Sequence, residues 1–162
     1  YDGNGRTGRI INILYLILCR LLDLPILYLS SYIIQHKGDY YRLLQDVRDN
    51  QNWEDWILFM IRSVEKTSIK TIQLILKMKE LMLTMKNNLR DNYKFYSQDL
   101  LNNLFKHPYT KIDFLAKDLG VSRITAANYL NELSKGQLLE KKKIGMANYY
   151  INKDLFELLT QR

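Results

Sequence analysis

The stretch between Gly38 and Pro108 constrains the fold most, because about seventy residues pass there without a glycine or proline. Within it, apolar residues recur at the spacing of one helix face, with charged residues between them. The pattern predicts one long helix from about Asn52 to Leu89. Its expected role is structural, as a spine that joins two domains.

Shorter helices are expected before this stretch. Residues 8–22 are predicted to form a core helix that stops before Pro25. The segments "SSYIIQH" and "DYYRLLQDVRD" predict two further helices separated by Gly38, with Asp39 as the N-cap of the second.

The C-terminal part has the pattern of a winged helix-turn-helix. "SQDLLNNLFKHP" predicts a capped amphipathic helix, and the residues after it predict a helix, a turn at Gly120 and a second helix capped by Ser122. Two strand-like runs flank Gly145 and predict a β-hairpin wing. The predicted fold is mainly α, with residues 1–92 as one domain that includes the long connecting helix and residues 93–162 as the winged helix.

Composition and charge limit the function classes. The formal net charge is +7, which invites a nucleic-acid interpretation, but the basic excess is spread along the chain. Cys19 is the single cysteine and lies in an apolar run, so we expect a buried thiol in a reducing compartment. The longest apolar stretch is too short to cross a bilayer, and we expect no signal peptide before it. We therefore expect a cytoplasmic protein with no membrane partner.

The first ten residues, "YDGNGRTGRI", contain a glycine-rich loop. Gly3, Gly5 and Gly8 satisfy the G-x-G-x-x-G pattern of dinucleotide-binding folds. That fold needs a strand before the loop and a parallel strand after the next helix, whereas this region is predicted to be helical. The context therefore argues against a dinucleotide site.

The same loop suits phosphate binding. Gly3 and Gly5 let backbone N–H groups turn around an anion, and the helix that begins near Gly5 directs the positive end of its dipole there. Arg6 and Arg9 are three residues apart and so share a helix face, where each can bind phosphate oxygens. Asp2 fits such a site if it holds Mg²⁺. The alternative from the residues alone is an ordinary helix N-terminus with solvated arginines.

The run "DGNGRTGR" resembles the second half of the signature of Fic-domain proteins, H-P-F-x-[D/E]-G-N-G-R-x-x-R, over eight consecutive residues. The apolar helix, "DYYRLL", a Trp-containing helix and a C-terminal winged helix resemble the bacterial Fic proteins that carry such a domain. The resemblance implies a protein adenylyltransferase, which transfers AMP from ATP to a Ser, Thr or Tyr hydroxyl of a protein substrate and uses Mg²⁺.

The resemblance also implies roles for individual residues. Asp2 would coordinate Mg²⁺, and Tyr41 would lie near the adenine. Some relatives have Asn where this chain has Arg48, so at this position the resemblance does not imply a contact with the base. The residues expected to bind the ATP phosphates are Gly3, Asn4 and Gly5 as an anion hole for the α-phosphate, and Arg6 and Arg9 for the outer phosphates.

The resemblance places the catalytic histidine four residues before Asp2, upstream of Tyr1, so none of the catalytic residues is present. That histidine would act as the general base on the substrate hydroxyl. His36 and His107 are expected to be ordinary, partly exposed residues. We therefore expect the chain to be a C-terminal piece of an adenylyltransferase that is inactive alone.

The second helix of the helix-turn-helix would present Arg123, Ile124, Ala127 and Asn128, while Ala126, Leu130 and Leu133 face inward. The wing offers Lys141, Lys142 and Lys143. These residues are the candidate contacts for DNA, or for a protein partner that includes a second copy of the chain, and the exposed Ile124 favours protein. A purely stabilising role is a third possibility. The competing class for the whole chain is a non-catalytic winged-helix binding or dimerisation module.

Overall fold

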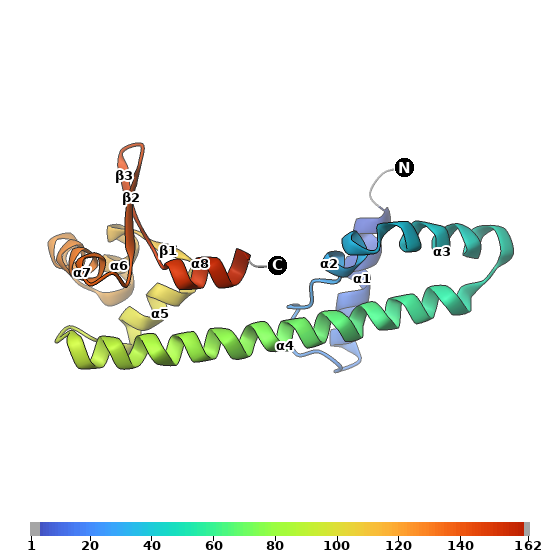
Figure 1. The fold of residues 1–162 in the computed structure, drawn as a ribbon, viewed down its shortest axis with the longest axis horizontal. Coiled ribbons are helices and arrows are strands. Elements are labelled where there is room, and N and C mark those ends of the chain that lie inside the picture. The colour runs from blue at the N-terminus through green and yellow to red at the C-terminus, as the bar shows by residue number, and fades with distance from the viewer. Residues whose placement is uncertain (1–3, 161–162) are drawn as a thin grey trace. The chain divides into compact units, whose positions relative to one another are not determined.

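A computed structural model describes residues 4–160, which form eight helices and three short strands (Figure 1). The predicted mainly α fold is confirmed. The chain divides into two compact units, Tyr1–Gln73 and Leu74–Arg162. This division falls inside the longest helix, and the sequence-based boundary after residue 92 stays a prediction. Among residues 4–160, no helix has both the length and the apolar character that a membrane crossing requires.

The first unit contains α1 (Asn4–Leu18), α2 (Leu29–Gln35), α3 (Lys37–Asn50) and the beginning of α4 (Trp53–Asn92). Ile33, Leu43 and Phe59 form its buried cluster, one from each of the last three helices. Aromatic rings cover this cluster, and the Tyr40 and Trp56 ring centroids lie 5.1 Å apart. The core of this unit is therefore small and aromatic.

The long helix predicted from Asn52 to Leu89 is confirmed as α4, which has 40 residues. At a rise of about 1.5 Å per residue it is about 60 Å long. Acidic residues occupy its first turn and Arg90 its last, which is the favourable arrangement of charge along a helix dipole.

Three predictions about the first unit are wrong in detail. The helix expected at 8–22 is α1, which begins at Asn4, ends at Leu18 and has no fully buried residue, so it is not a core helix. Cys19 follows its last residue and is exposed, because it lies where the chain turns out of the helix.

The boundary between α2 and α3 is also displaced. His36 ends α2 and precedes α3, so Gly38 lies inside α3 and Asp39 is in its first turn instead of at the N-cap. Asp39 still suits that place, because its carboxylate interacts favourably with the helix N-terminus and lies 3.3 Å from Arg42.

The second unit is a winged helix, as predicted. Its elements after α4 are α5 (Gln98–Lys106), β1 (Tyr109–Thr110), α6 (Ile112–Leu119), α7 (Arg123–Lys135), β2 (Glu140–Ile144), β3 (Ala147–Ile151) and α8 (Lys153–Thr160). The strands form an antiparallel sheet in the order β1-β3-β2. The hairpin β2–β3 extends beyond the helices of this unit (Figure 1).

The predicted caps and turn of this unit are confirmed. The Ser97 side chain accepts a hydrogen bond from the Leu100 N–H, and Ser122 accepts one from the Thr125 N–H. Gly120 ends α6 with a φ of 65°, a left-handed conformation that glycine adopts without strain. These local signals separate the two helices of the helix-turn-helix.

A leucine-rich core holds the second unit together. Fully buried residues come from α4 to α7 and from β3: Leu89, Leu100, Leu101, Leu104, Leu115, Ala126, Leu130, Leu133 and Tyr150. The sequence analysis did not predict β1, which has only two residues, or α8. Helix α8 begins after the buried Asn152. The Oδ1 atom of Asn152 accepts a hydrogen bond from the Leu155 N–H at 3.1 Å, and its Nδ2 donates one to the Leu104 carbonyl at 3.3 Å.

Candidate phosphate-binding site and winged helix

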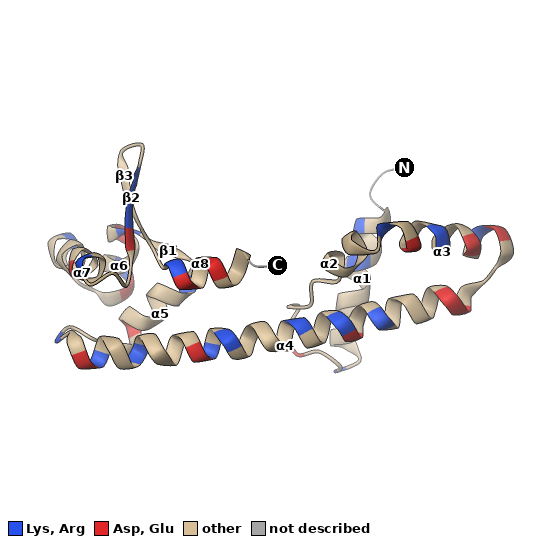
Figure 2. Cartoon of the chain, in the orientation of Figure 1, with Lys and Arg blue, Asp and Glu red and all other residues tan. Residues whose placement is uncertain are grey.

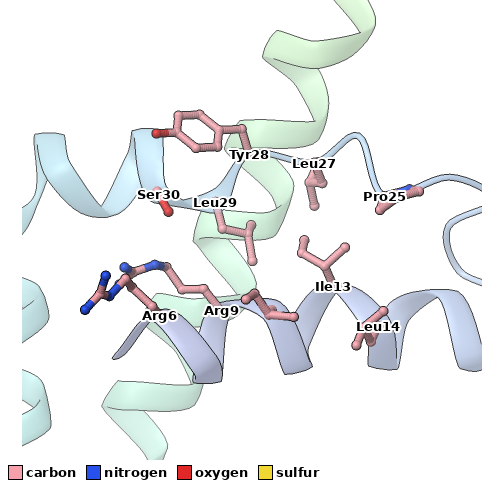
Figure 3. Close-up of a pocket in the computed structure, with 10 residues that line it drawn as sticks. Arg6, Arg9, Ile13, Leu14, Pro25, Leu27, Tyr28, Leu29 and Ser30 are labelled. Atoms are coloured by element: carbon pink, nitrogen blue, oxygen red, sulfur yellow. The ribbon is translucent and has the colours of Figure 1, made fainter. Parts of the chain in front are cut away.

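A cleft of about 450 Å³ lies in the first unit between α1 and the segment that leads into α2. Arg6 and Arg9 line one end of it, close to Ser30, and apolar side chains line the rest toward Leu14 and Pro25 (Figure 3). None of the described residues that line the cleft is acidic. The cleft therefore combines an apolar wall with two positive charges at one end.

The two arginines reach the same cleft because they are three residues apart on the first turns of α1. Arg9 folds back toward the start of the helix, since its Nη1 lies 3.6 Å from the position that a Cβ on Gly5 would take. The first N–H groups of a helix have no partners within the helix, and they carry the positive end of its dipole. The charges and the helix N-terminus are thus close together.

The other residues predicted for this site are placed as follows. Asn4 and Gly5 are the first residues of α1. Asp2 and Gly3 lie outside the described residues, so their roles stay predictions. Tyr41 lies on α3, is 57% exposed and does not line this cleft. Its ring contacts Tyr40 instead, at a centroid distance of 5.4 Å.

Neither histidine lines the cleft. His36 is exposed and lines a separate cavity of about 310 Å³ together with charged residues of α3 and α4, among them Asp39 and Arg62. His107 is exposed in the second unit, after the end of α5. Sequence reasoning missed Tyr28 and Ser30, which also line the cleft. No local pattern places them beside Arg6 and Arg9, because they come from a different segment.

In the winged helix, α7 has the orientation that its sequence predicts. Ala126, Leu130 and Leu133 are completely buried, and Ile124 is 76% exposed. Arg123 is exposed but forms an ion pair with Asp113 of α6, at 2.9 Å between Nη1 and Oδ1. The first turn of α7 is therefore linked to the first turn of α6.

The three wing lysines differ from one another although all are exposed on β2. Lys141 donates a hydrogen bond from Nζ to Asn131 Oδ1 at 2.9 Å, and its ammonium lies 5.5 Å from the centroid of the Tyr150 ring. Lys142 pairs with Tyr149 across the hairpin and Lys143 with Asn148. Only the first of the three thus has a hydrogen-bond partner among the residues that the structure describes.

Residues 78–155 match the family model described as "Protein adenylyltransferase SoFic-like, C-terminal domain". The match begins in the last part of α4 and ends in the first turn of α8, so it includes the whole helix-turn-helix and the wing. It agrees with the Fic resemblance of the first ten residues, which lie outside the matched range. Over residues 78–155 the chain is therefore similar to the C-terminal domain of SoFic-like protein adenylyltransferases, and this similarity is consistent with a Fic-type adenylyltransferase.

Proposed function

We propose that this chain provides the phosphate-binding part of a site that transfers AMP from Mg·ATP to a Ser, Thr or Tyr hydroxyl of a protein substrate. The observation that carries the proposal is the convergence of Arg6 and Arg9 on one cleft at the N-terminal end of α1, with no acidic residue in its described lining. The family match supports the reaction class.

The described residues have donors suited to a polyphosphate. A guanidinium group binds phosphate oxygens through two parallel hydrogen bonds, and two such groups at one end of a cleft can bind the outer phosphates together. Backbone N–H groups at Asn4 and Gly5 suit the α-phosphate, since helix N-termini bind anions. The cleft volume is within the usual range for small-molecule sites.

Mg²⁺ would be held by Asp2 and would neutralise part of the phosphate charge. The fit of the described residues to ATP rests on their charge, which is wholly positive at the arginine end of the cleft.

The hydroxyl that attacks the α-phosphate must lose its proton to a base. Neither His36 nor His107 lines the cleft. We therefore expect residues 1–162 to bind nucleotide without transferring AMP.

A binding experiment tests the phosphate site. Titration of the 162-residue chain with a fluorescent ATP analogue and Mg²⁺ should show saturable binding that adenosine does not displace. Arg6→Ala and Arg9→Ala should each weaken it about tenfold or more, since each removes a bidentate charged contact. Arg90→Ala in the last turn of α4 is the control with the same loss of charge. Unchanged binding by both cleft variants, or adenosine competing as well as ATP, would contradict the proposal.

The transfer reaction needs a separate test. Incubation of the chain with α-labelled ATP and a cell extract should label no protein above the level seen with the Arg6→Ala variant. Labelling that depends on the intact arginines would refute the expected inactivity, but it would support the assignment of the cleft.

A further inference from the structure

The sheet of the second unit has one face turned away from the core. Thr110 and Tyr150 are buried, and neighbouring residues of a strand point to opposite faces, so Tyr109 and Tyr149 lie on the other face. Lys142 is opposite Tyr149 in the β2–β3 register and shares this face. We define the outer-face patch as Tyr109, Lys111, Phe114, Lys142 and Tyr149.

Short contacts order this patch. The Lys111 ammonium lies 4.2 Å from the centroid of the Tyr149 ring and 5.5 Å from that of Phe114. The Tyr109 and Tyr149 ring centroids are 5.4 Å apart, with the rings tilted by 57°. The neighbouring Tyr149 side chain raises the pKa of Lys111, so this lysine carries its charge throughout the physiological pH range. Lys111 is therefore a fixed positive charge at the surface.

The patch has more positive than negative charge. Glu140, on the same face as Lys142, is 3.5 Å from Lys153. For Lys142 the structure records neither an ion pair nor a hydrogen bond with another described residue. Three consecutive lysines, Lys141 to Lys143, lie within β2 and make this strand of the hairpin basic (Figure 2). An anionic partner would thus meet Lys111 and Lys142 on one surface.

The aromatic contacts favour a partner with exposed phosphates over one with exposed bases. Single-stranded nucleic acids bind by stacking bases on free ring faces. Here the Tyr109 and Tyr149 rings pack on each other and the Lys111 ammonium lies over the Tyr149 and Phe114 rings, so part of the aromatic surface is covered and ammonium and phenol groups are exposed beside it. Such groups suit the phosphates of a duplex, whose bases are stacked inside.

The patch also adjoins the helix that could enter a groove. Asp113 lies between Lys111 and Phe114 in the chain and pairs with Arg123 at the start of α7. Both side chains of this pair are more than half exposed, so a phosphate can compete with Asp113 for Arg123. In helix-turn-helix proteins the second helix lies in the major groove while neighbouring elements contact the backbone.

We propose that the outer-face patch binds the phosphate backbone of duplex DNA, beside a groove that receives the first turn of α7. This function is separate from nucleotide binding in the first unit. It assigns the wing contact to Lys142 and excludes Lys141, which Asn131 holds on the opposite face.

Fluorescence anisotropy with a labelled random-sequence duplex of about 20 base pairs tests the proposal, with the 162-residue chain and several salt concentrations. The affinity should fall steeply with added salt, because phosphate contacts release counterions. A single strand of equal length and poly-glutamate are the competing ligands, and each should bind at least about tenfold more weakly, because neither presents the phosphates of a duplex.

Matched variants then locate the surface. Lys142→Gln and Lys111→Gln should each lower the affinity about three- to tenfold, since each removes one backbone contact. Lys143→Gln is the control, because it removes the same charge from the next residue, which faces the other side of the hairpin. Asp113→Asn should raise the affinity, and a variant that damaged the fold would not do so.

Several results would overturn the proposal. Equal losses for Lys142→Gln and Lys143→Gln would show an undirected charge effect. Poly-glutamate bound as tightly as the duplex would indicate an acidic protein partner. A single strand bound more tightly than the duplex would indicate base stacking. Absence of duplex binding at low salt up to about 100 µM would also refute it, because even non-specific sites bind near this range.

Discussion

Replacing Asn103 with leucine should destabilise the winged helix by about 3 kcal/mol. Asn103 is 4% exposed, donates from Nδ2 to Asp118 Oδ2 at 2.8 Å, and accepts from the Thr110 hydroxyl at 2.7 Å. Leucine has nearly the same shape but can form neither bond. A hydrogen bond to a charged group contributes about 1.5–3 kcal/mol, and a buried hydroxyl left without its partner costs about 1–3 kcal/mol. The added apolar burial offsets part of this loss.

Hydrogen exchange read by mass spectrometry over α5 and α6 measures this change in free energy. Trp53 and Trp56 are the two tryptophans and both belong to the first unit, so tryptophan fluorescence during urea unfolding should stay unchanged. Asn102→Leu, an identical replacement at an exposed neighbour, should cost less than about 0.5 kcal/mol.

A second substitution tests whether the buried hydroxyl accounts for part of the loss. In the Asn103→Leu background, Thr110→Val removes the unpartnered group, so the double variant should lose about 1–2 kcal/mol less than the two single losses added together. Strict additivity, or an Asn103→Leu loss no larger than that of Asn102→Leu, would refute the reasoning.

Three further predictions concern other features. The hydrogen bond from Asn103, and then Lys106, lowers the pKa of Asp118. Its stabilising effect is fully present above the ordinary aspartate value of about 4 and is lost as the pH falls through the lowered value, so urea unfolding monitored by circular dichroism should show a smaller acid loss in Asp118→Asn. Gly120→Ala should cost about 1 kcal/mol in the same assay, from backbone strain alone, because a Cβ there meets no atom within 4 Å. Cys19 should react with a maleimide in the native protein nearly as fast as in urea, and strong protection would contradict its exposure.

The features that sequence predicted well depend on local chemistry. Ser97 and Ser122 cap the helices that follow them, and Gly120 adopts the conformation that its turn requires, because each acts within a few residues of its own backbone. The long helix α4 was equally predictable, since no breaker interrupts its apolar spacing.

The features that failed depend on contacts distant in the sequence. Cys19 lies in an apolar run, but burial requires a partner surface, and the structure leaves it exposed. At the candidate site, spacing was enough to place Arg6 and Arg9 on one face of α1. It gave no sign of Tyr28 or Ser30, which reach the cleft from the next segment. In the wing, strand alternation separates the lysines by face, but the bond from Lys141 to Asn131 joins two elements and has no sequence pattern.

The absence of fully buried residues in α1 has a consequence for ligand affinity. A helix of 15 residues is marginal in water without tertiary packing, so the population in which α1 is folded becomes part of the binding equilibrium. If that population were about one tenth, the apparent dissociation constant would be about tenfold weaker than the contacts alone provide. A surface that covers the exposed apolar side of α1 would then tighten nucleotide binding without touching the nucleotide.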